Sequence, residues 1–120
     1  MKPYIHSKNS VRRYGGKIED YLHLHEWMDS TKSATANFYH RAILHNATGI
    51  FIGEQIFGST FVNSDGKTLS TRDILEDHVK EDCAGIIPTI DDWLHDLPPK
   101  DWRIGKGMKN YIRSIEMEID

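Results

Sequence analysis

The sequence has almost no cysteine and no long apolar segment. Cys83 is the one cysteine among 120 residues, so no disulfide can form within the chain and we expect a reducing compartment, the cytoplasm. The longest apolar run is Ile50-Phe51-Ile52, far short of the roughly 20 residues that a membrane-spanning helix needs. The first ten residues lack the apolar segment of a secretory signal. These absences predict a cytoplasmic protein that does not enter a membrane.

Several catalytic signatures are missing as well. Gly15-Gly16 and Gly105-Lys106-Gly107 lack the spacing of a phosphate-binding loop, and no Ser-His-Asp or Cys-His order is recognisable. Cys83 follows acidic residues that raise the pKa of a thiol, which argues against a nucleophilic thiolate. The net charge is −3, with basic residues gathered at positions 2–17 and acidic ones at 73–96. This acidic balance argues against nucleic acid as a partner.

The spacing of apolar residues predicts a mainly α protein, a compact helical domain of five to six helices with one short β-hairpin. A chain of this length builds one hydrophobic core. We expect a histidine-rich helical domain at residues 1–97 and a helical tail at 98–120, because apolar residues recur at helical spacing near the end of the chain. That tail could also pair two copies of the chain as a homodimer.

The boundaries of these elements follow from capping and turn residues. Pro3 and Gly15 bound a first helix at residues 3–14. A second helix begins near Ile18 and turns four residues towards the core: Tyr21, Leu24, His25 and Met28. A long third helix is expected at residues 31–57, with His45 on its apolar stripe.

The second half of the domain begins with strand-forming residues. The hairpin pairs residues 60–62 with 67–69 around a Ser-Asp-Gly turn. Ser70 and Asp73 resemble a capping box at the start of the next helix, which Gly85 ends. A short helix then starts after Thr89 and continues through Leu94.

Histidines and aspartates form the sharpest pattern in the chain. His25 and Asp29 are four residues apart, as are His78 and Asp82, so each pair shares one face of a helix. Imidazole and carboxylate together suit zinc, iron, manganese or nickel, and Cys83 as an extra ligand would favour zinc. We therefore expect a site for a divalent transition metal, with zinc as the first choice by ligand type. Its ligands are drawn from six residues: His25, Asp29, His40, His45, His78 and Asp82.

Within this set His40, His45 and His78 are the first choice as ligands. The others, with His6, are either ligands or partners that orient a ligating imidazole. Asp29 has an equal claim as an N-cap of the following helix. A buried polar cluster that holds no ion explains the same residues.

Two functions remain open at this point. A metal-bound water could hydrolyse a phosphoester, with Glu54, Glu76 or Glu81 as general base. The alternative is a non-enzymatic interaction protein that binds another protein or a small molecule and uses the histidines only to fix its helices.

Four stretches resemble a family of small uncharacterised proteins from bacteria and their phages: HSKNSVRRYGG, EDYLHLHEWMDSTK, FYHRAILHNATGIFIGEQIFG and RDILEDHVKEDCAGIIPTIDDWL. The resemblance spans residues 3–97. It implies that the family shares these positions: His6, His25, Asp29, His40, Arg41, His45, His78, Glu81, Asp82, Ile87 and Pro88. It supplies no activity, although the phage context implies a role in host takeover or defence evasion.

Overall fold

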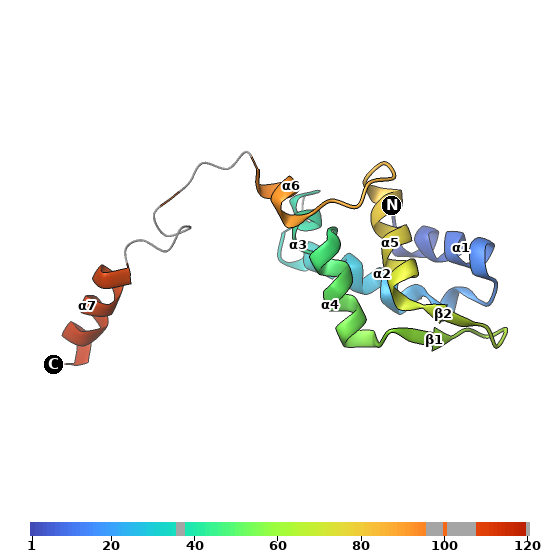
Figure 1. The fold of residues 1–120 in the computed structure, drawn as a ribbon, viewed down its shortest axis with the longest axis horizontal. Coiled ribbons are helices and arrows are strands. Elements are labelled where there is room, and N and C mark those ends of the chain that lie inside the picture. The colour runs from blue at the N-terminus through green and yellow to red at the C-terminus, as the bar shows by residue number, and fades with distance from the viewer. Residues whose placement is uncertain (36–37, 96–99, 101–107, 120) are drawn as a thin grey trace.

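The computed structural model describes residues 1–35, 38–95, 100 and 108–119. Its elements follow in this order, the η elements being short 3₁₀ turns: α1 (Pro3–Tyr14), η1 (Ile18–Asp20), α2 (Leu22–Met28), η2 (Ser30–Ser33), η3 (Phe38–His40), α3 (Arg41–Leu44), α4 (Ala47–Phe57), β1 (Thr60–Val62), β2 (Thr68–Ser70), α5 (Thr71–Asp82), α6 (Ile90–Leu94) and α7 (Met108–Ile119). The predicted mainly α class with one hairpin is confirmed (Figure 1).

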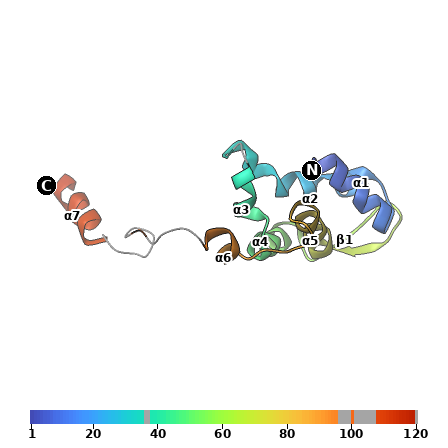
Figure 2. The same cartoon turned by 90° about the horizontal axis from the view of Figure 1, so that it is seen from above.

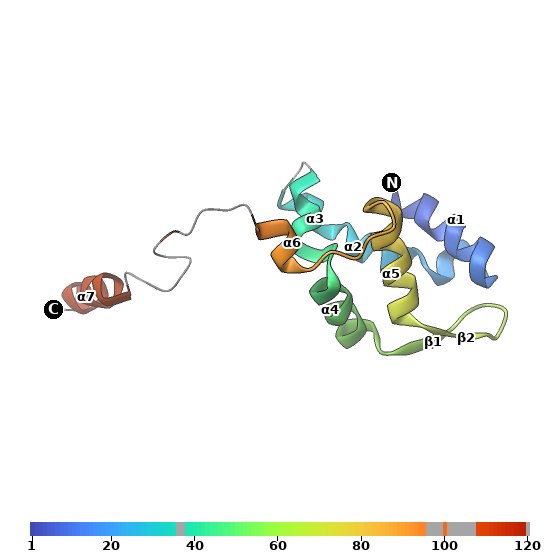
Figure 3. The same cartoon turned by 45° about the horizontal axis from the view of Figure 1, so that its top comes forward.

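The helices of the body form two layers. Seen from above, α1 and α2 lie in one layer and α4 and α5 in the other, with α5 packed against α4, α2 and α1 (Figure 2). The antiparallel hairpin joins α4 to α5 and projects from their ends, while α7 lies apart from the other helices (Figures 1 and 3). Within the described part of the chain, the helices are too short or too polar to span a lipid bilayer.

The apolar core lies between these layers. Its fully or nearly fully buried side chains are Tyr21, Leu24, Met28, Leu44, Ile50, Leu69, Ile74, Leu75 and Val79. The inward face predicted for α2 is confirmed, because His25 is buried beside the apolar residues of that helix. A histidine inside such a core needs polar partners, since burying an unpaired polar group costs free energy.

Several helix ends are confirmed and others are corrected. Gly15 closes α1 at φ +82°, and Thr89 forms a capping box with Asp92 at the start of α6. Ser70 makes no side-chain capping bond, so the box predicted with Asp73 is wrong. The second strand begins one residue later than predicted, and the segment from Ile18 opens with η1 before α2 begins.

The long helix predicted at residues 31–57 is wrong, because Asn46 interrupts it. The Asn46 side chain accepts a hydrogen bond from Gly49 N at 2.8 Å and so caps α4, while its amide donates to Ala42 O at 2.9 Å at the end of α3. A Cβ at position 49 would overlap the carbonyl group of Leu44. His45 therefore lies in a turn with φ −81° and ψ +62°, and this turn directs its ring towards α5.

Candidate metal centre

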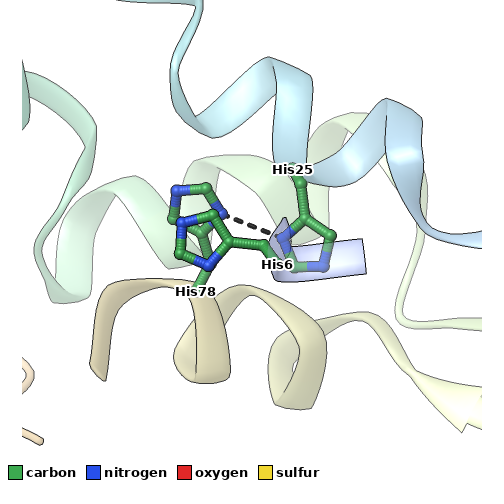
Figure 4. Close-up of side chains that lie close together, drawn as sticks. All are labelled: His6, His25 and His78. Carbon is green, nitrogen blue, oxygen red and sulfur yellow. Dashed lines mark hydrogen bonds between the residues drawn. The ribbon is translucent and has the colours of Figure 1, made fainter. Parts of the chain in front are cut away.

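Polar side chains from α1, α2, α5 and the α3–α4 turn meet between the two layers. His6, His25, His45 and His78 are all completely buried. In Figure 4 the rings of His6, His25 and His78 approach one another from α1, α2 and α5. Segments that are far apart in the sequence therefore supply one continuous cluster of imidazoles and carboxylates.

Four donor atoms in this cluster converge on one point: Asp29 Oδ1, His45 Nε2, His78 Nε2 and Asp82 Oδ2. We call these four residues the convergent group. His45 Nε2 lies 2.9 Å from Asp82 Oδ2, 3.2 Å from His78 Nε2 and 3.4 Å from Asp29 Oδ1. His78 Nε2 lies 3.2 Å from Asp29 Oδ1 and 3.3 Å from Asp82 Oδ2.

These separations match those around a metal ion. Nitrogen and oxygen ligands at about 2.0–2.1 Å from a tetrahedral ion lie about 3.3–3.4 Å from one another. The carboxylates are also nearly inaccessible, with side chains 6% exposed for Asp29 and 2% for Asp82. The convergent group could therefore hold a transition metal ion with little movement of its side chains.

The pKa values in this group reflect strong mutual interaction. Burial alone would raise the pKa of Asp29, but hydrogen bonds with His45 and His78 lower it well below its usual range. Burial likewise raises the pKa of Asp82, but hydrogen bonds with His45, His6 and His78 lower it to an even greater extent than at Asp29. Burial lowers the pKa of His45, and the two carboxylates more than offset it, so the net shift is upward.

A second set of residues surrounds His78 from the other side. We call this set the hydrogen-bonded group: His6, Ser10, His25 and Glu81. His25 Nδ1 lies 2.9 Å from His78 Nδ1, a contact drawn as a dashed line in Figure 4. His25 Nε2 lies 2.8 Å from Ser10 Oγ, which in turn donates to the His6 carbonyl oxygen at 3.2 Å.

This chain of contacts assigns the protons. Ser10 uses its hydrogen on a carbonyl oxygen, so its Oγ accepts from His25 Nε2–H. His25 is neutral, because burial and the neighbouring imidazoles lower its pKa to about 3. Its Nδ1 therefore accepts from His78 Nδ1–H, and in the His78 tautomer with its single proton on Nδ1 the Nε2 lone pair faces the carboxylates.

In that tautomer, hydrogen-bond acceptors outnumber hydrogen-bond donors in the convergent group. Asp29 Oδ1, Asp82 Oδ2 and the His78 Nε2 lone pair are three acceptors, and only His45 Nε2–H can donate among the four atoms. Asp29 Oδ2 is buried and has no hydrogen-bond partner among the described residues. A bound cation would satisfy all of these acceptors at once.

His6 and Glu81 complete the hydrogen-bonded group. The His6 ring stacks on the ring of His78 at a centroid separation of 3.7 Å. His6 Nδ1 lies 2.9 Å from Glu81 Oε1, and its Nε2 lies 3.3 Å from Asp82 Oδ1. Glu81 also accepts from Asn9 at 2.8 Å and from Arg13 at 2.6 Å. Both nitrogens of His6 thus already face carboxylates.

Five of the six predicted metal residues meet in this cluster: His25, Asp29, His45, His78 and Asp82. The sixth, His40, is buried with its ring edge-on to His45 at 5.7 Å between centroids. It belongs to neither group of described residues whose ligand atoms lie close enough to share an ion, which are the convergent group and the trio of His6, His25 and His78. A ligand role for His40 stays a prediction. Cys83 is half-buried outside both sets, and burial raises the pKa of its thiol.

The two His-x-x-x-Asp pairs selected from the sequence make different contacts in the structure. His78 and Asp82 contact each other directly, whereas His25 and Asp29 both reach across to His78. Asp29 makes no side-chain capping bond, so the capping alternative is wrong. Sequence reasoning missed Ser10, because a serine on a helix carries no signal of a distant histidine partner.

Comparison with known proteins supplies a family without an activity. No match was found among curated proteins or among solved structures. The family described as a domain of unknown function, DUF6915, matches residues 1–103. The matched range contains every residue of the convergent and hydrogen-bonded groups. The chain therefore belongs to the DUF6915 family.

Proposed function

We propose that this protein binds one divalent transition metal ion, with zinc as the first choice, through Asp29, His45, His78 and Asp82. The observation that carries the proposal is the convergence of four buried ligand atoms, all within 4.8 Å of one another and joined by five contacts of 2.9–3.4 Å, beside an Asp29 Oδ2 that has no hydrogen-bond partner among the described residues. Zinc suits a tetrahedral set of two imidazoles and two carboxylates. Manganese and iron(II) accept the same ligands with further open positions.

An ion at this point would join three segments of the fold. Asp29 follows α2, His45 lies between α3 and α4, and His78 and Asp82 lie on α5. Binding to the folded state alone stabilises a protein in proportion to the logarithm of ligand concentration over Kd. Metal removal is therefore expected to lower the unfolding temperature of this protein.

Hydrolysis of a phosphoester is the catalytic form of this proposal. A bound ion with an open position lowers the pKa of a coordinated water, which can then attack phosphorus. Of the three candidate bases, Glu81 is connected to the convergent group through His6, which itself lies 3.3 Å from Asp82. Glu54 is paired with Arg72 at 2.8 Å instead.

Metal analysis of the purified full-length chain tests the proposal. We expect about one metal ion per chain, lost in His45→Ala and in His78→Ala. His23→Ala is the matched control, because His23 is an exposed histidine on α2 and is expected to leave the metal content unchanged. Metal-free protein whose unfolding temperature is unaffected by added zinc, manganese or iron(II) would overturn the proposal.

The rival function is a non-enzymatic interaction protein whose histidines form a structural polar cluster. One observation favours it: His45 faces two carboxylates and His6 faces two more, so protonated rings could balance the charge without an ion. Under this rival proposal the protein is of bacterial or phage origin, acts in the cytoplasm and binds an unidentified protein or small molecule.

Dimerisation through α7 is part of the same proposal. Analytical ultracentrifugation that compares the full chain with a chain ending at residue 97 tests it.

A further inference from the structure

A pocket opens beside the candidate metal centre. It has a volume of about 480 Å³ and is lined by Arg41, Asp82, Cys83, Ile86, Pro88, Asp92 and Trp93. The lining residues come from the start of α3, the end of α5, the α5–α6 connection and α6. This volume lies within the usual range for small-molecule sites. Asp82 belongs to both the pocket wall and the convergent group.

Arg41 gives the pocket a cation with unused donors. Its Nη1 reaches the Asp82 carbonyl oxygen at 3.4 Å and its Nη2 lies 3.9 Å from Asp82 Oδ1, both long contacts. Its Nε is buried and has no hydrogen-bond partner among the described residues. A guanidinium carries five N–H donors in a planar fork that matches the oxygens of a phosphate. Because the contacts of its two terminal nitrogens with Asp82 are long, the Arg41 guanidinium can still bind an anion.

Trp93 gives the pocket a fixed aromatic wall. Its indole Nε1–H donates to the His45 carbonyl oxygen at 3.0 Å, which holds the ring against the α3–α4 turn. Pro88 is tied to the same turn, because its carbonyl oxygen accepts from Ala47 N at 2.8 Å. With Ile86, these residues offer an apolar surface to a planar group.

We propose that this pocket binds a small phosphoester of an aromatic or heterocyclic group, with Arg41 holding the phosphate and Trp93 contacting the ring. The choice of a phosphoester rests on the proposed metal centre, because a phosphate at Arg41 would lie beside Asp82. Hydrolysis there adds one water: its oxygen bonds to phosphorus, the ester P–O bond breaks, and the departing oxygen takes a proton.

Calorimetric titration of the zinc-loaded full chain tests this pocket with three probes: adenosine monophosphate, adenosine and inorganic phosphate. We expect the monophosphate to bind at least tenfold more tightly than either fragment, since it fills both parts of the pocket. Arg41→Gln is expected to weaken the monophosphate at least tenfold and Arg41→Lys by less, because lysine keeps the charge without the planar fork. Trp93→Leu is expected to weaken the monophosphate while leaving phosphate unchanged.

The controls separate this inference from the proposed metal centre. Trp93→Phe keeps an aromatic wall and reports the loss of the bond to His45 alone, and His23→Ala is expected to match the unaltered chain in every titration. Zinc content is measured in each variant and is expected to stay unchanged in the Arg41 variants. Zinc-loaded protein that binds the monophosphate no more tightly than adenosine or inorganic phosphate overturns the pocket assignment and leaves the metal centre standing. A chain that takes up no metal but binds the monophosphate through Arg41 overturns the centre and supports the pocket.

Discussion

The convergent group and the hydrogen-bonded group are equally buried and share His78 as a neighbour, yet they differ in how their polar atoms are satisfied. Both ring nitrogens of His25 have hydrogen-bond partners, Ser10 Oγ and His78 Nδ1. His6 Nδ1 is paired with Glu81 Oε1, whereas His6 Nε2 lies 3.3 Å from Asp82 Oδ1 without a hydrogen-bond partner among the described residues. The convergent group instead brings two imidazole nitrogens and two carboxylate oxygens to one point, and the second oxygen of Asp29 has no hydrogen-bond partner among the described residues. The difference teaches that proximity alone does not make a metal site; the convergence of imidazole and carboxylate ligand atoms identifies it.

Substitution of His78 by alanine breaks both groups at once and has the largest expected effect. It removes one convergent donor and leaves His25 Nδ1 without its partner. We expect complete loss of bound metal and a fall of about 3–5 kcal/mol in the free energy of unfolding, typical of breaking a buried polar network. Urea unfolding and metal analysis measure the two effects. A variant that keeps its metal would contradict the division into two groups.

Asp29→Asn alters the convergent group alone. The side chain keeps its shape but loses the negative charge that His45 and His78 stabilise against the effect of burial. We expect metal affinity to fall at least about 100-fold, because a neutral amide is a poor ligand for zinc. Competition with a chromophoric chelator measures the affinity. An affinity within a factor of about three of the unaltered chain would remove Asp29 from the ligand set.

His25→Gln alters the hydrogen-bonded group alone and sharpens the comparison. His25 orients His78 through its Nδ1 without reaching the convergent point. We expect a loss of about 10–100-fold in metal affinity with the stoichiometry preserved, as for partners that orient a ligating imidazole. The same chelator assay serves as the readout, with His23→Ala beside it. Loss of stoichiometric binding would instead make His25 a ligand.

Glu81→Gln has the smallest expected effect and depends on pH. Burial raises the pKa of the Glu81 carboxyl, but hydrogen bonds from His6, Arg13 and Asn9 more than offset this effect and lower the pKa to about 2. The Glu81 contribution is therefore complete above its unfolded pKa and is lost as pH falls. Burial lowers the pKa of His6, and its contacts with Asp82 and Glu81 raise it overall, so that contribution is lost as pH rises.

The stability difference between the metal-free chain and its Glu81→Gln variant should therefore be largest between about pH 4.5 and pH 6.5. Urea unfolding in the presence of a chelator, at a series of pH values, measures this difference. A difference that stays constant down to about pH 3 would contradict the coupling of Glu81 to His6 and Arg13.

Helical periodicity predicted much of the fold and part of the site. The 3.6-residue pattern located α1, α5 and α6, and capping residues bounded α1 and α6. The inward face of α2 identified His25. His45 was selected from a stripe on a continuous helix that does not exist. Its burial was predicted for the wrong reason, since the turn at Asn46 directs the ring inward.

The remaining differences concern distances between segments, which local spacing does not determine. His40 and His45 are five residues apart in the chain, yet only His45 reaches α5. The contact between Ser10 and His25 depends on the packing of α1 on α2. The pocket lined by Arg41 depends on the course of the α5–α6 connection. Such contacts arise from tertiary packing, which the periodicity of apolar residues along the sequence does not predict.

The β-hairpin divides the convergent group evenly. Asp29 and His45 precede it, His78 and Asp82 follow it, and its turn at residues 63–67 is exposed apart from Asn63. A protease cut in that turn would leave two fragments, each with one imidazole and one carboxylate of the convergent group. Neither fragment alone could complete a four-coordinate shell, so a shared ion would act as the cross-link that keeps a nicked molecule in one piece.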